Sequence, residues 1–184
     1  MKRMIAAARS ALVAGAVLTT FTATGAVAQE STNRVAANTD WSVFVEDNPT
    51  GCWSVSAPTK VVNTRDGRAV AAKRGDIRLF VSYHPGSQVK GQVSFAGGYP
   101  FDRNKAITLT IDTKSYQLYS EGSPQNRETA WANPSEEAQI VAAMKRGAKA
   151  VVTAYSGRGT RTEDTFSLLG FTAAVDEAAK RCGN

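Results

Sequence analysis

Histidine and cysteine are the residues that this 184-residue sequence has least of, with one and two copies respectively. A serine or cysteine hydrolase needs a base beside its nucleophile, and His84 is the single histidine that could serve. His84 precedes Pro85 at the expected end of a strand, and no Gly-x-Ser-x-Gly sequence presents a serine. A zinc site needs more ligands than one histidine and two cysteines readily supply. We therefore expect no catalytic residues, no metal site and no cofactor.

Long apolar runs are also absent, except near the start of the chain. There, three basic residues precede the apolar run 11–18, and small residues follow at 26–28. The run is shorter than the roughly 20 residues of a spanning helix. This pattern predicts a secretory signal peptide over residues 1–28, cleaved after Ala28. We expect no transmembrane segment in the mature chain.

Removal of the signal peptide lowers the charge of the chain. Residues 1–28 contain three basic residues and no acidic one, so the formal net charge falls from +6 to +3. The remaining Lys and Arg residues are scattered and are not interleaved with an aromatic platform, which argues against nucleic-acid binding. We predict a flexible N-terminal arm over residues 29–40, which are polar and aperiodic, and a single domain over 41–184.

The two cysteines are predicted to form a disulfide. In an exported chain Cys52 and Cys182 are expected to oxidise to one another. The bond closes a loop of about 130 residues, for which the chain-entropy treatment gives roughly 5 kcal/mol of stabilisation. A reactive thiol would need a neighbouring base, which favours a structural role.

Short segments with alternating apolar and polar residues predict a mainly antiparallel sheet. Turns rich in Gly, Pro and Asn separate them. In Ile107–Ile111, for example, the isoleucines and Leu109 are expected in the core and the threonines at the solvent. The fold class is therefore mainly β (α+β), an antiparallel β-sandwich or barrel-like sheet with two helices. The expected strands cover residues 41–45, 52–56, 77–83, 91–95, 107–111, 116–119, 150–155 and 160–168.

Two helices are predicted. The first has Asn133 as its N-cap and Pro134 as its first residue, and it ends at Gly147. The second places an apolar stripe on one face, so Cys182 should point inward, and it carries the i,i+4 pairs Asp176/Lys180 and Glu177/Arg181. The stripe consists of Phe171, Val175, Ala178 and Cys182.

Two loops supply candidate partner-binding residues. The Gly-Gly-Tyr-Pro-Phe sequence at 97–101 presents Tyr99 and Phe101 on a stiff turn, with core packing as the alternative. The expected hairpin tip at 156–159 places Arg158 and Arg161 where they could contact an anionic partner such as lipopolysaccharide or a phospholipid head group. Asp164 precedes a strand-to-helix passage and is expected to have a capping or turn role.

The chain resembles the invasion-associated locus B (IalB) family of exported bacterial proteins. The resemblance runs from about Trp41 to Cys182 and implies a periplasmic or outer-membrane-associated protein. The family is named for a role in host-cell entry, but it supplies no catalytic residues. The residues that carry the resemblance are Cys52-Trp53, Arg74-Gly75, 79–82, 98–101, Ile140-Val141 with Gly147, Ser156, Gly159-Thr160, 164–172 and Cys182.

These observations predict a non-enzymatic binding or interaction module, acting in the periplasm, at the outer membrane or at the cell surface. Its expected partner is an envelope protein or an anionic envelope component, with a link to host-cell interaction or envelope function. One alternative is an envelope enzyme acting on peptidoglycan or lipid, which a cleft gathering His84, an acid and a serine would favour. The other is a structural accessory subunit of an envelope complex, which a broad apolar face would favour.

Overall fold

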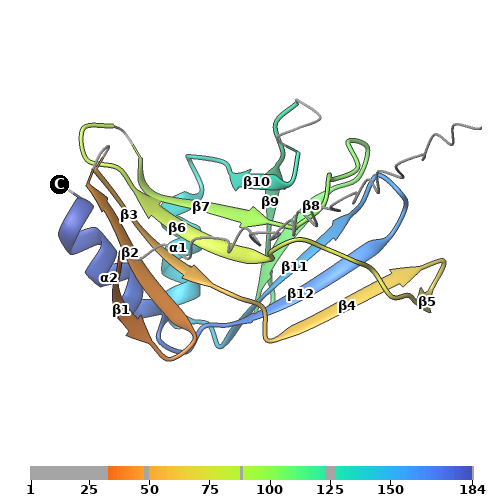
Figure 1. Cartoon of the computed structure of the whole chain (residues 1–184), viewed down its shortest axis with the longest axis horizontal. Helices are drawn as coiled ribbons and strands as arrows, with labels where there is room; N and C mark the ends of the chain where they lie inside the picture. Colours follow the sequence, from red (N-terminus) through yellow and green to blue (C-terminus); the bar gives the residue numbers. More distant parts are fainter. Residues whose placement is uncertain (1–32, 48–49, 88, 123–126, 184) are drawn as a thin grey trace, which may run out of the picture. The chain divides into compact units, whose positions relative to one another are not determined.

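Twelve antiparallel strands form one sheet in the computed structural model, which describes residues 33–47, 50–87, 89–122 and 127–183 (Figure 1). The predicted signal peptide lies outside these residues. The strands are β1 (Arg34–Asn38), β2 (Trp41–Asp47), β3 (Thr50–Ser56), β4 (Lys60–Arg65), β5 (Arg68–Ala69), β6 (Arg78–Tyr83), β7 (Lys90–Ala96), β8 (Ile107–Ile111), β9 (Lys114–Tyr119), β10 (Thr129–Ala132), β11 (Lys149–Tyr155) and β12 (Arg161–Ser167).

The sheet curls because two strands that are consecutive in the chain, β3 and β4, lie near opposite ends of the strand order. The strand order is β1-β2-β3-β6-β7-β10-β9-β8-β11-β12-β4-β5. β3 pairs with β2 and β6, whereas β4 pairs with β12 and β5 at the other end of the order. Residues 57–59 alone separate β3 from β4, so the two ends of the order are held together and the strands surround a common interior (Figure 1). The predicted barrel-like antiparallel sheet with two helices is confirmed.

Alternation along the strands fills this interior with apolar side chains. Ile107, Leu109 and Ile111 of β8 are buried, as predicted, while the threonines between them are only half-buried. Leu79, Val81, Val93 and Phe95 continue the same face across β6 and β7. One face of most of these strands therefore builds a single core, to which β4 and β5 contribute no buried side chain.

The C-terminal helix, α2 (Phe171–Cys182), closes one end of this core. Its predicted stripe of Phe171, Val175, Ala178 and Cys182 is buried. The Phe171 ring packs edge-on against Trp41 at 4.8 Å between centroids, and the indole Nε1 of Trp41 donates to the Ser167 carbonyl. The predicted disulfide is present, since Cys182 is bonded to Cys52 of β3.

Two details of the helices differ from the predictions. Helix α1 (Glu137–Arg146) begins later than expected, because the Asn133 side chain accepts hydrogen bonds from Ser135 and so stabilises a turn that precedes the helix. In α2, Asp176 forms its ion pair with Lys145 of α1 at 2.6 Å. The predicted Glu177/Arg181 pair is confirmed.

Four strands were not expected from the sequence. Part of the predicted flexible arm forms β1, which pairs with β2, so the expectation of a loose segment fails for residues 34–38. β4, β5 and β10 also lie outside the predicted strands. Trp53 is half-buried on the outer face of β3 and stacks on Phe44 of β2.

Candidate functional site

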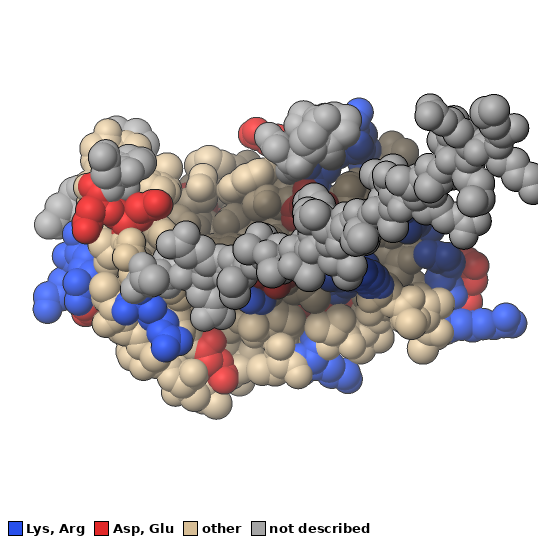
Figure 2. All heavy atoms as spheres, viewed as in Figure 1, with Lys and Arg blue, Asp and Glu red and all other residues tan. Residues whose placement is uncertain are grey.

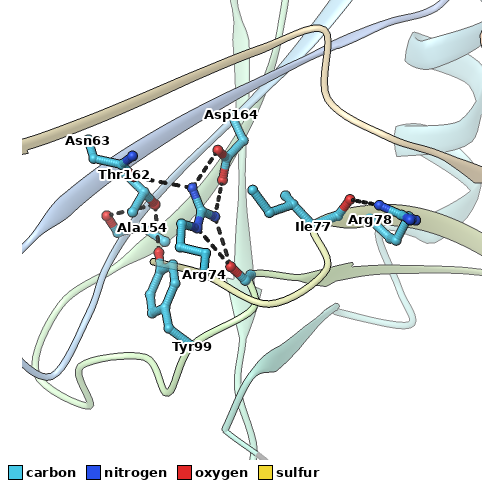
Figure 3. Close-up of polar contacts among 9 residues, drawn as sticks. Asn63, Arg74, Ile77, Arg78, Tyr99, Ala154, Thr162 and Asp164 are labelled. Carbon is cyan, nitrogen blue, oxygen red and sulfur yellow. Dashed lines mark hydrogen bonds and ion pairs between the residues drawn. The ribbon is translucent and has the colours of Figure 1, made fainter. Parts of the chain in front are cut away.

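A buried ion pair joins the middle of β12 to the irregular segment 70–77. The inward face of β12 is polar at its start, with Thr162 and then Asp164, and becomes apolar at Phe166. The Asp164 side chain is 0% exposed, and the Arg74 side chain that pairs with it is 5% exposed. Arg74 Nη1 donates to Asp164 Oδ1 at 2.7 Å and Nη2 donates to Oδ2 at 2.6 Å (Figure 3). Such a bidentate pair is the strongest geometry for arginine and a carboxylate.

Every N–H group of the Arg74 guanidinium has an acceptor. Besides the two bonds to Asp164, Nε and Nη2 donate to the Gly97 carbonyl at 3.0 and 2.8 Å, and Nη1 donates to Asn63 Oδ1 at 3.3 Å. An arginine has five N–H donors, so none remains for a ligand. The carbon at the centre of the guanidinium also lies 4.9 Å from the Tyr99 ring centroid. Arg74 is therefore part of the framework of the site.

The segment 70–77 is held against the 97–100 loop by backbone contact as well. Gly75 N–H donates to the Gly98 carbonyl at 2.9 Å. A Cβ on Gly98 would come within 2.6 Å of the Gly75 carbonyl oxygen, and the φ of Gly98 is +71°. A side chain at position 98 would thus force the two segments apart.

Tyr99 connects this framework to β12. Its hydroxyl shares a hydrogen bond of 2.6 Å with Thr162 Oγ1 (Figure 3). Burial raises the pKa of Tyr99 to about 12, so the phenol is neutral at physiological pH. Burial also raises the pKa of Asp164, while the hydrogen bonds and the charge of Arg74 act in the opposite direction. The bidentate geometry supports the ionised form of Asp164 at neutral pH.

Above this framework lies a cavity of about 460 Å³. Segments far apart in the sequence form its walls, namely 71–74, 98–100 and the turn between β11 and β12. Besides Arg74, three cationic side chains line it, together with one acid, Glu128. In Figure 2, Lys and Arg atoms are visible at the end of the sheet that carries β5 and also at the opposite end, beside α2. The three cationic residues besides Arg74 are Arg65, Lys73 and Arg158.

The predicted partner-binding residues divide between the cavity and the rest of the molecule. Tyr99 and Arg158 line the cavity. Phe101 is 1% exposed and packs between Phe95 and Tyr99, so its ring belongs to the core and does not reach a partner. Arg161 points to the opposite face of β12, where it pairs with Glu163 at 2.9 Å.

The structure also shows where His84 and Asp164 lie relative to the cavity and to the secondary structure. His84 lies in the turn after β6, against Gly51, and is not among the residues that line the cavity. Asp164 neither caps a helix nor forms a turn, because it lies within β12. In the described part of the chain, no group of three or more His, Cys, Asp and Glu residues has a metal-binding arrangement.

Comparison with known proteins identifies the family. The sequence model described as "Invasion associated locus B (IalB) protein" matches residues 41–179. The chain belongs to the invasion associated locus B family. A crystal structure of invasion associated protein B from Bartonella henselae has the same fold, with 13% identity, a TM-score of 0.51, and coverage of 79% of this chain and 95% of that chain. None of the curated proteins compared matches the chain.

In this IalB family member, several residues that carry the sequence resemblance come together at the cavity. Arg74-Gly75, Gly98-Tyr99 and Asp164 belong to three separate stretches of sequence and share one cluster of contacts, and Thr160, from a fourth stretch, lines the same cavity. The sequence pattern alone does not place these residues in contact. The available signal was Asp164 itself, since alternation from Thr162 to Phe166 places it on the inward face, where a carboxylate requires a buried partner.

Proposed function

We propose that the mature chain is a non-enzymatic binding module of the bacterial envelope that acts outside the cytoplasm. The cavity above the Arg74–Asp164 pair is its ligand site. The observation that carries this proposal is the contrast between a fully paired floor and cationic walls whose donors are largely unused. Family membership and the Cys52–Cys182 disulfide support export to an oxidising compartment, which is the periplasm, the outer membrane or the cell surface.

The chemistry of the cavity supports binding in preference to catalysis. Asp164 is the buried acid nearest the cavity, but Arg74 occupies both of its oxygens and it is not accessible to a substrate. The one histidine of the chain lies elsewhere, so the cavity does not gather the histidine, acid and serine that the enzymatic alternative requires. The IalB family is not known as an enzyme family.

The alternative of a structural accessory subunit has less support. Such a subunit would present a broad apolar face. The large apolar side chains exposed in the described residues are dispersed over β1, β4, β9 and the turn that precedes α2. Neither described helix has the length and apolar character needed to cross a membrane. The exposed apolar residues are Val35, Val61, Tyr119 and Leu169.

Site-specific photocrosslinking tests the proposal. A photoreactive residue at Ala72, which lines the cavity, is expected to capture an envelope component when the oxidised protein is expressed in its own cells. The matched control carries the same residue at Thr108, on the outer face of β8. Capture from Ala72 alone, identified by mass spectrometry, supports the cavity as the ligand site. Equal capture from both positions, or none from Ala72, overturns it.

A further inference from the structure

The three cations of the cavity have donors that no described residue accepts. Arg65 Nη2 donates to Thr160 Oγ1 at 2.7 Å, which orients the guanidinium and leaves its other N–H groups without a described acceptor. Lys73 and Arg158 are exposed and form no ion pair with any described residue. Glu128, the acid in the lining, is likewise outside the ion pairs of the described chain.

The main chain adds donors to the same wall. In segment 70–77, Val70 N–H and Gly75 N–H donate to Asn63 and Gly98 carbonyls. The N–H groups of residues 71–74, between them, have no acceptor among the described residues. All four of these residues line the cavity.

Two arginines near these cations are already neutralised by acids of the chain. Arg74 is neutralised by Asp164, and Arg161 is paired with Glu163. Arg65, Lys73 and Arg158 line the cavity without an ion pair in the described chain. Two of them are guanidinium groups, whose planar forks match the oxygens of a phosphoryl group in bidentate geometry.

We propose that the cavity binds the phosphoryl group of a sugar-phosphate or phospholipid head group, with Arg65, Arg158 and Lys73 contacting the phosphate oxygens. This inference rests on the proposed function and names its ligand class. A volume of about 460 Å³ exceeds that of a phosphate alone and leaves room for an attached sugar or glycerol. Tyr99 and Pro100 provide a less polar wall for that part of the head group.

Two probes distinguish the sources of the phosphate. The first is glucose 1-phosphate, titrated against the oxidised mature protein by calorimetry, with glucose as the uncharged control. The second is a vesicle of phosphatidylglycerol in phosphatidylcholine, compared with phosphatidylcholine alone in a flotation assay. Binding to the sugar phosphate identifies a soluble or glycan-borne phosphate, and binding to the vesicle alone identifies a lipid head group. Either result supports the inference, and binding to neither overturns it.

A pair of arginine variants supplies the internal control. Arg158→Ala and Arg161→Ala change the net charge equally and lie three positions apart, but only Arg158 lines the cavity. Arg158→Ala is expected to weaken binding of the productive probe about tenfold or more, since it removes hydrogen bonds between charged groups. Arg161→Ala should change it less than about twofold, because its interaction is an exposed pair on the other face. Equal losses in both variants would show nonspecific charge attraction and overturn the inference.

The outcome separates this inference from the proposed function. If the photoreactive residue at Ala72 captures a defined envelope component while both phosphate probes fail to bind, the cavity is a ligand site and the phosphoryl assignment is wrong. If capture at Ala72 fails and the probes bind with the Arg158 dependence, the proposed role in the envelope is overturned, while phosphoryl binding by the cavity stands on the in vitro result. Failure of both removes the cavity as a site.

Discussion

Asp164→Asn tests the buried ion pair with the smallest change of shape. The substitution keeps the side-chain volume and one acceptor but removes the negative charge that faces Arg74 through bonds of 2.6 and 2.7 Å. Arg74 is 5% exposed and cannot lose its proton, so its charge stays buried without a counter-charge. Removing one partner of a buried pair costs about 3–5 kcal/mol. One retained hydrogen bond offsets about 1 kcal/mol, so we expect a loss of roughly 2–4 kcal/mol.

Urea unfolding of the oxidised protein, followed by tryptophan fluorescence, measures this loss. The control is Glu163→Gln, one residue along the same strand, where the carboxylate pairs with Arg161 at the surface and both side chains are 39% exposed. That exposed pair contributes at most about 1 kcal/mol. If Asp164→Asn destabilises the protein no more than Glu163→Gln does, the assignment of stability to the Arg74–Asp164 pair is refuted.

Three further predictions concern the disulfide, a glycine and a tyrosine. Cys182→Ser opens a loop with a sequence separation of 130 and should lower the free energy of unfolding by about 5 kcal/mol; an unchanged melting temperature without reductant would contradict this. Gly67→Ala should destabilise the protein by roughly 1–2 kcal/mol, because the residue has a positive φ. Gly170→Ala should destabilise it more, because φ is positive there too and a Cβ would also overlap the Asn38 carbonyl. Equal urea midpoints for the two variants would show that the overlap is relieved. Burial raises the pKa of Tyr83 from 10.0 to about 12, so the contribution of its neutral phenol to the free energy of unfolding is complete below pH 10 and is lost as the pH rises through 12. Between pH 10 and 12, the urea midpoint of the wild type should therefore fall more steeply than that of Tyr83→Phe. Parallel curves for the two proteins would contradict this prediction.

The strands predicted correctly are those whose alternation is strong enough to define an inner face. Residues 107–111 alternate isoleucine or leucine with threonine, and the observed β8 has the predicted bounds. The missed strands carry weaker patterns. β4, with the sequence Lys-Val-Val-Asn-Thr-Arg, has one valine and two polar residues on each face, so no face is distinctly apolar, and its strand conformation follows from pairing with β12. That pairing depends on tertiary structure, which a local pattern does not contain.

The candidate site was predictable only in part, because its members meet through long-range contacts. Tyr99 and Arg158 were identified as exposed loop residues, and both line the cavity. Arg74 and Asp164 lie 90 positions apart, and no local spacing connects them. A rule that treats every inward-facing carboxylate of a strand as half of a buried pair would have identified Asp164 and required an arginine for it.

A buried ion pair is seldom the most stabilising choice, since apolar residues of similar size often do as well. Stability alone therefore does not explain the Arg74–Asp164 pair. The position of Lys73, next to Arg74 in the sequence, suggests that the pair also fixes the wall of the cavity. The five hydrogen bonds of Arg74 fix the segment whose unused N–H groups and Lys73 line the cavity. The double variant Arg74→Met/Asp164→Leu removes both charges, so it should be more stable than Asp164→Asn.

The same double variant should nevertheless lose photocapture at Ala72, because segment 70–77 is no longer tied to β12 and to the Gly97 carbonyl. The double variant would then combine higher stability than Asp164→Asn with loss of capture, which a purely structural role of the ion pair does not allow. Urea unfolding and capture yield on the same preparations give the comparison. Wild-type capture by a folded double variant would show that the pair serves stability alone, and that the cavity wall keeps its shape without it.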